Sequence, residues 1–163
     1  LYAGMSNASS VIIGKTLGRG EKDLAYKYSI KMMKLTFVFN IFTMTLLIIA
    51  IWPIAGIYGF EPETTDMLVK SLLVFAAAQL PKMLVYVLVC GIIRAGGDTV
   101  WCLKMEFLFN FCCQIGLALI AVNILGLPLY LSIAVVMLAE VTKSIVCIYR
   151  VLSKKWMNVF TGR

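Results

Sequence analysis

The sequence predicts an all-α membrane protein, a polytopic transmembrane helix bundle with about four complete spans and the end of a fifth. Of its 163 residues, 61% are hydrophobic and 14% are charged, whereas soluble domains are about 45–50% apolar and about 25% charged. The apolar residues gather in blocks that are long enough to cross a bilayer, which takes about 20 residues per helix. Short segments with glycine, proline or charged residues separate these blocks.

The first part of the chain is predicted to contain one partial and one complete span. Residues 1–18 have the pattern of a helix end, which stops at Gly18-Arg19-Gly20 because glycine favours helix termination. The apolar pattern is already running at Leu1, so we expect the chain to be a fragment of a longer protein. A basic, amphipathic stretch at 21–34 then leads into the first complete span, at 35–57.

Three further spans are predicted in the rest of the chain. The second complete span covers residues 67–93 and follows an acidic turn at Glu61-Pro62-Glu63. The third covers residues 99–122, and a short hinge at 123–128 separates it from the last span, which runs to about Val151. The polar segment Ser153-Lys154-Lys155-Trp156 then leaves the membrane.

Lys and Arg residues indicate the orientation of these spans, because cytoplasmic loops retain them. They gather at 15–34, around Arg94, and from Lys143 to the carboxy terminus, whereas the intervening loops at 58–66 and 123–130 contain neither residue type. We therefore expect a multi-pass protein of the cell membrane whose carboxy terminus is cytoplasmic. Their position at helix ends favours contact with lipid headgroups and gives no support for nucleic-acid binding.

The segment between the second and third spans predicts a sharp cytoplasmic turn. Gly96 and Gly97 interrupt the helix, and Arg94 precedes them. Asp98 can cap the helix that follows and oppose the positive charge of its amino end.

Ionisable side chains within a span are costly in hydrocarbon and therefore indicate functional sites. Three are predicted here: Lys82, Glu106 and Glu140. Counted along their helices, Lys82 and Glu140 both lie near the middle of the membrane, and Glu106 lies nearer the cytoplasmic side. Because Lys82 and Glu140 share a depth and have opposite charges, we expect them to interact. Lys82 could instead serve only to neutralise Glu140.

Other features near these charges are typical of transporters. Pro81 cannot donate a backbone hydrogen bond, so a helix kink is expected there, and kinked helices often carry transport sites. The polar side chains of Gln79, Asn110 and Gln114 are further candidates for transport or coupling. They could equally form hydrogen bonds between helices with no transport role.

The composition gives little support for an enzyme, a cofactor or a metal site. The chain has no histidine, the commonest general base and metal ligand. Its five cysteines lie in apolar segments without the C-x-x-C spacing of redox or zinc sites. We expect no enzymatic activity, no cofactor and no bound metal other than a coupling ion.

The sequence resembles the multidrug and toxic compound extrusion (MATE) family in three regions. These are Ala8-Ser9-Ser10-Val11-Ile12-Ile13-Gly14-Lys15-Thr16-Leu17-Gly18-Arg19-Gly20, the turn from Arg94 to Thr99, and the downstream segments Leu127-Pro128-Leu129-Tyr130 and Ser153-Lys154-Lys155-Trp156 with Glu140 between them. The resemblance implies that residues 1–163 form part of the carboxy-terminal lobe of a two-lobe transporter, from the end of helix eight through helix twelve. The amino-terminal lobe of the same transporter would be its partner.

The resemblance further implies export of drugs or organic cations in exchange for Na⁺ or H⁺. Members of the similar branch carry an acid at the position of Glu106, and the family couples transport through carboxylates, so Glu106 and Glu140 are the coupling candidates. An alternative from the same superfamily is a flippase for lipid-linked saccharides, which would need more cationic residues around its cavity. A membrane-embedded enzyme or a non-transporting subunit fits less well, because the first lacks clustered catalytic groups and the second leaves Glu140 unexplained.

Overall fold

The computed structural model describes residues 2–58 and 61–158, and within these ranges the protein is helical with no strands. This confirms the predicted all-α class. In chain order the elements are α1 (Tyr2–Gly18), α2 (Lys22–Tyr58), α3 (Pro62–Tyr86), η1 (Val87–Ile93), α4 (Thr99–Phe107), η2 (Leu108–Ile115), α5 (Gly116–Leu119), η3 (Ile120–Ile124) and α6 (Leu129–Leu152), where η marks a π-helical segment.

Four helical stretches in the described residues are long and apolar enough to cross a membrane, which confirms the predicted number of complete spans. They are Lys22–Ile57, Pro62–Ile93, Thr99–Ile124 and Leu129–Leu152. Each apolar stretch is mostly unburied within the protein, at 11–33% buried. The exposed apolar side chains are therefore available to lipid, as expected for membrane helices.

The basic stretch at 21–34 and the apolar block at 35–57 form a single helix, α2. Its 37 residues extend over about 55 Å, well beyond the hydrocarbon core of about 30 Å. Part of α2 must therefore lie outside the hydrocarbon, and its lysine-rich amino-terminal part has the composition for this position.

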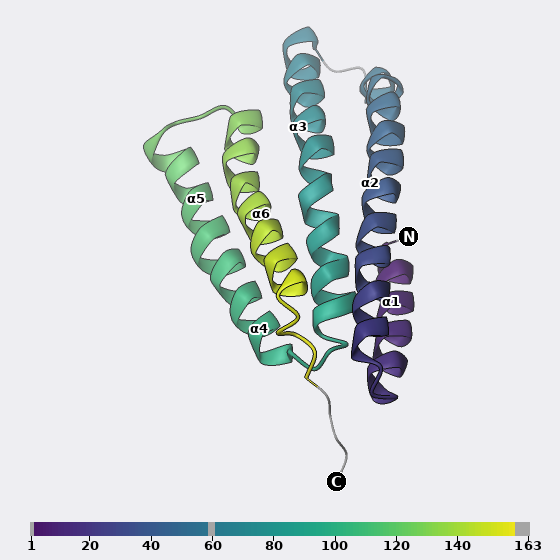
Figure 1. Ribbon diagram of the computed structural model, residues 1–163. Coiled ribbons are helices and arrows are strands. Elements are labelled where there is room, and N and C mark those ends of the chain that lie inside the picture. Colours follow the sequence, from purple (N-terminus) through teal and green to yellow (C-terminus); the bar gives the residue numbers. More distant parts are fainter. Residues whose placement is uncertain (1, 59–60, 159–163) are drawn as a thin grey trace.

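Helix α3 lies between α2 and α6 and packs against both (Figure 1). The rod that begins with α4 and continues through α5 lies on the outer side of α6, and α1 packs against α2 and η1. The main core lies where α1, η1, α4 and α6 meet, and includes Ile13, Val89, Ile92 and Cys147. Pro81 lies inside α3, and the predicted kink there stays a prediction.

The predicted turn lies between η1, which ends at Ile93, and α4, which begins at Thr99. Gly97 has φ +87°, a conformation that favours glycine because it has no Cβ. Gly96 lies against the fully buried Trp156, and a Cβ at Gly96 would overlap the indole ring and the Trp156 carbonyl. The backbone N–H of Asn158 also donates to the Gly96 carbonyl at 2.9 Å. The turn is thus covered by the carboxy-terminal segment.

The predicted capping role of Asp98 is wrong. Asp98 occupies the N-cap position of α4, but its side chain forms no capping hydrogen bond. Its carboxylate instead accepts hydrogen bonds from Arg150 Nε at 2.8 Å and Arg150 Nη2 at 2.6 Å. The guanidinium on α6 offers this carboxylate a full positive charge and two donor nitrogens, whereas a backbone N–H offers one neutral donor.

Candidate functional site

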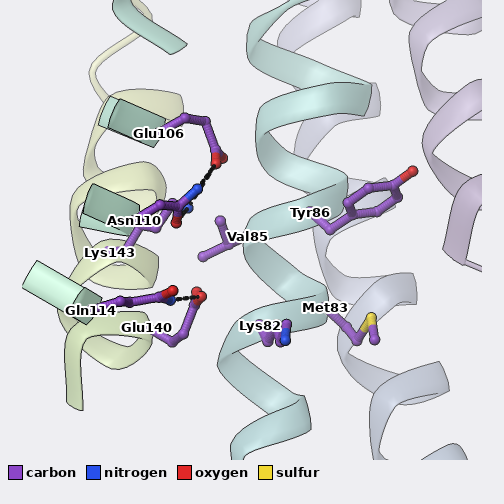
Figure 2. A pocket seen from close by; sticks show the side chains of 9 residues that line it. All are labelled: Lys82, Met83, Val85, Tyr86, Glu106, Asn110, Gln114, Glu140 and Lys143. Carbon is purple, nitrogen blue, oxygen red and sulfur yellow. Dashed lines mark hydrogen bonds and ion pairs between the residues drawn. The ribbon is translucent and has the colours of Figure 1, made fainter. Parts of the chain in front are cut away.

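A polar cavity of about 330 Å³ opens between α3, the α4–η2 rod and α6. Figure 2 shows its side chains, which come from all three helical stretches. The lining consists of two acids, two lysines, two amides and three less polar residues: Glu106, Glu140, Lys82, Lys143, Asn110, Gln114, Met83, Val85 and Tyr86. Five of the six coupling candidates from the sequence therefore meet in one place.

The first group in the cavity is built around Lys143, which is buried with a side chain 4% exposed. Its Nζ lies 3.1 Å from Glu106 Oε2 and donates to Asn110 Oδ1 at 3.2 Å. Asn110 Nδ2 in turn donates to Glu106 Oε2 at 2.8 Å (Figure 2). Asn110 thus bridges the acid and the lysine, and Glu106 has a fixed positive partner.

Sequence reasoning missed Lys143, which was counted among the basic residues of the cytoplasmic end. The available signal was its spacing of three residues from Glu140 on the same helix, which places the two side chains on one face. A lysine on the face of a buried acid points into the bundle. Its ion pair with Glu106 corrects the assignment of Lys143 to the headgroup region.

The second group in the cavity is built around Glu140, which is 5% exposed. Gln114 Nε2 donates a short hydrogen bond to Glu140 Oε1 (Figure 2). No Lys or Arg in the described part of the chain forms an ion pair with Glu140. The carboxyl group is therefore buried beside a neutral amide, a costly environment for an unpaired charge.

The predicted interaction between Lys82 and Glu140 is not formed. Both residues line the cavity, from α3 and α6 respectively, but no ion pair or hydrogen bond joins them. The Lys82 side chain lies near the Phe75 ring, with Nζ 5.9 Å from the ring centroid. The two residues thus line the same cavity, but their side chains have different neighbours.

Gln79 belongs to a separate polar cluster between α1, α2 and α3. Its Nε2 lies 3.5 Å from the Tyr2 hydroxyl and 3.4 Å from Thr43 Oγ1. The Tyr2 hydroxyl also donates to Asn40 Oδ1 at 2.9 Å, and Asn40 Nδ2 lies 3.4 Å from the Leu80 carbonyl. These contacts favour the interhelical hydrogen-bond interpretation of Gln79, away from the charged cavity.

The most polar groups of the cavity are its carboxylates, amides and ammonium groups. Glu106 and Glu140 belong to two different groups, and no cluster of three His, Cys, Asp or Glu residues occurs in the described ranges. The amide nitrogens of Asn110 and Gln114 donate to the two carboxylates, and the Asn110 oxygen accepts from Lys143. Each carboxylate thus has its own amide partner, and in the described residues only Glu106 also has a cationic partner.

Comparison with known proteins gives one match. The model of a family described as MatE matches residues 1–120, which run from α1 to the beginning of η3. The matched part includes Lys82, Glu106, Asn110 and Gln114, whereas Glu140 and Lys143 lie beyond it. No curated protein and no solved structure matches the chain.

Proposed function

Because the chain belongs to the MatE family of membrane transporters, we propose that it acts in the export of organic cations or similar drugs, coupled to the entry of Na⁺ or H⁺. In this proposal residues 1–163 contribute the end of helix eight through helix twelve to the carboxy-terminal lobe. The amino-terminal lobe completes the transport cavity. The protein acts in the cell membrane, with the segment around Lys154 in the cytoplasm.

The observation that carries the proposal is the environment of Glu140. Its carboxyl group is 5% exposed and has only an amide hydrogen-bond partner. In low dielectric a carboxylate without a positive partner is unfavourable, so a proton, a Na⁺ ion or a cationic substrate stabilises it. Exchange among these three at one group links the movement of one species to the movement of another.

Glu106 has a different role in the proposed mechanism. Its charge is already compensated by Lys143 at 3.1 Å, so an incoming cation must displace this lysine. The released Lys143 ammonium would then repel a second cation from the cavity. In this mechanism Glu140 is the acid that exchanges cations. The Glu106–Lys143 ion pair is intact when the cavity holds no cation and is broken when a cation binds.

The experiment is efflux of a fluorescent organic cation by the full-length protein, with an imposed Na⁺ or H⁺ gradient. Glu140→Gln keeps the hydrogen-bonding shape but cannot carry a negative charge, so we expect efflux to fall to background. The matched control is Glu63→Gln, since Glu63 is an exposed acid at the beginning of α3. Efflux by Glu140→Gln at the level of the control would contradict the proposal.

One observation favours the alternative of a lipid-linked saccharide flippase. Lys82 lines the cavity without an ion-pair partner in the described residues, and it could therefore bind an anionic pyrophosphate group. Under this alternative, Lys82→Gln abolishes transport and Glu140→Gln has little effect. Because a flippase does not export the organic cation, efflux by the unaltered full-length protein separates the two functions, and the Lys82→Gln and Glu140→Gln variants are then compared in the assay for the substrate that is moved.

A further inference from the structure

A second cavity lies on a different part of the bundle and is almost entirely apolar. It has a volume of about 430 Å³ and is lined by Met33, Lys34, Phe37, Val38, Leu84 and Ile148, from α2, α3 and α6. It shares no lining residue with the charged cavity. Its volume falls within the range of about 300–1,000 Å³ that is common for ligand pockets. One lysine in an otherwise apolar groove indicates an amphiphilic occupant.

Lys34 is the last member of a lysine stripe on α2. Lys27, Lys31 and Lys34 are spaced four and three residues apart, which places them on one face of the helix. All three are exposed, and none forms an ion pair in the described part of the chain. Lys143, Arg150 and Lys154, in contrast, each pair with an acid. The three lysines of this stripe are therefore available to bind an anionic group.

The same face of α2 becomes apolar immediately after Lys34. Val38, four residues further on, is 62% exposed and Ile41 is 44% exposed. The helix ends at Tyr58, so Lys34 lies about 36 Å from that end, just beyond a hydrocarbon core of about 30 Å. The change from lysine to apolar side chains thus falls where lipid headgroups meet acyl chains.

We propose that this groove is a specific binding site for an anionic glycerophospholipid. One acyl chain lies against Phe37, Val38, Leu84 and Ile148, and the phosphate is bound by Lys34 and Lys31. A soluble anion would leave the apolar lining unused, and a zwitterionic lipid would bring its own positive charge to the lysines. An anionic lipid satisfies both parts of the site.

The test measures the thermal stability of the purified full-length protein in neutral detergent as lipid is added. Phosphatidylglycerol and phosphatidylcholine with identical acyl chains are compared, and the concentration dependence of Tm gives the affinity. We expect phosphatidylglycerol to raise Tm and phosphatidylcholine to have little effect. Equal shifts with both lipids would overturn the proposal.

Four substitutions locate the site. Lys34→Gln and Lys31→Gln should each weaken phosphatidylglycerol binding about fivefold, and Lys34→Arg should retain it. Val38→Trp should block the acyl chain while leaving both charges in place. The control is Lys155→Gln, which removes an exposed lysine of the carboxy-terminal segment and should change nothing.

Two outcomes would contradict the proposed site. Affinity unchanged in the Lys31→Gln, Lys34→Gln double variant would show that the lipid binds elsewhere. A Tm increase of the same size with glycerol phosphate alone would show that the stripe binds soluble anions. The transport assays of the preceding proposal are not involved, so either proposal can fail without the other.

Discussion

The Nζ atom of Lys143 lies 3.1 Å from Glu106 Oε2 and joins α6 to α4 within the charged cavity. The lysine side chain is 4% exposed and the acid 35%. The Lys143 side chain is thus buried, whereas the Glu106 side chain remains accessible from the cavity opening. Because the lysine has no other acid to bind in the described residues, its burial depends on Glu106 and on Asn110.

Removal of either partner should destabilise the protein. We expect Glu106→Gln or Lys143→Met to lower the free energy of unfolding by about 1–2 kcal/mol, less than for a fully buried pair because Glu106 is partly exposed. The double variant should lose less than the sum of the two. The matched control is the exposed pair Lys70–Asp66, for which Lys70→Met should cost little, because solvent screens exposed ion pairs. Additive effects at Glu106 and Lys143 would contradict the ion pair.

Lys82 and Glu140 should behave independently in stability measurements. No ion pair joins them, so the effects of Lys82→Met and Glu140→Leu on unfolding in detergent should add within about 0.5 kcal/mol. A coupling free energy above this value would show that Lys82 and Glu140 do form an ion pair in the detergent-solubilised protein. Efflux measured on the same variants tells whether the two residues depend on each other during transport.

Gly96→Ala should be strongly unfavourable because the added Cβ would overlap Trp156. We expect a loss of about 1–3 kcal/mol in unfolding free energy, typical of an overpacked interior. Gly116→Ala provides the control, since nothing lies within 4 Å of a Cβ there and alanine favours helix. A Gly96→Ala protein as stable as the Gly116→Ala protein would mean that the carboxy-terminal segment does not cover the turn.

The role of the Asp98 side chain can be tested by substituting a residue that caps helices but carries no charge. Serine is a good N-cap, so Asp98→Ser would be tolerated if capping were the main role of this side chain. Because the carboxylate binds Arg150 Nη2 at 2.6 Å, we expect a loss of about 1–2 kcal/mol instead. Arg150→Gln should cost a similar amount, with little further loss when both are changed. A stable Asp98→Ser variant would restore the capping interpretation.

The orientation of the helices can be measured with single cysteines in a cysteine-free background. The positive-inside pattern predicts that Glu63→Cys reacts with a membrane-impermeant thiol reagent from outside the cell. Lys155→Cys, in the carboxy-terminal segment, should react only after the membrane is opened. Both positions are exposed, so lack of reaction cannot be due to burial. Labelling of position 63 only from the cytoplasmic side would reverse the topology.

Much of the architecture follows from the sequence, because span length and polarity act along the chain. The apolar blocks located four spanning helices, and the glycines at 96 and 97 located the turn before α4. The sequence also identified polar side chains within the apolar blocks, and five of the six candidates share one cavity. The sequence analysis divided α2 into two stretches, because the change from basic to apolar residues marks the edge of the span although the helix itself continues.

By itself, the sequence determined the height of Lys82, Glu106 and Glu140 along their own helices, since 1.5 Å per residue converts position into height. Only the tertiary structure decided which charges meet, because an ion pair also depends on how each helix is rotated about its axis and which helix lies beside it. Rotation and neighbour are set by packing over the whole bundle. For this reason Glu106 binds Lys143 and Glu140 binds Gln114, while Lys82, in the same cavity as Glu140, forms no ion pair with it.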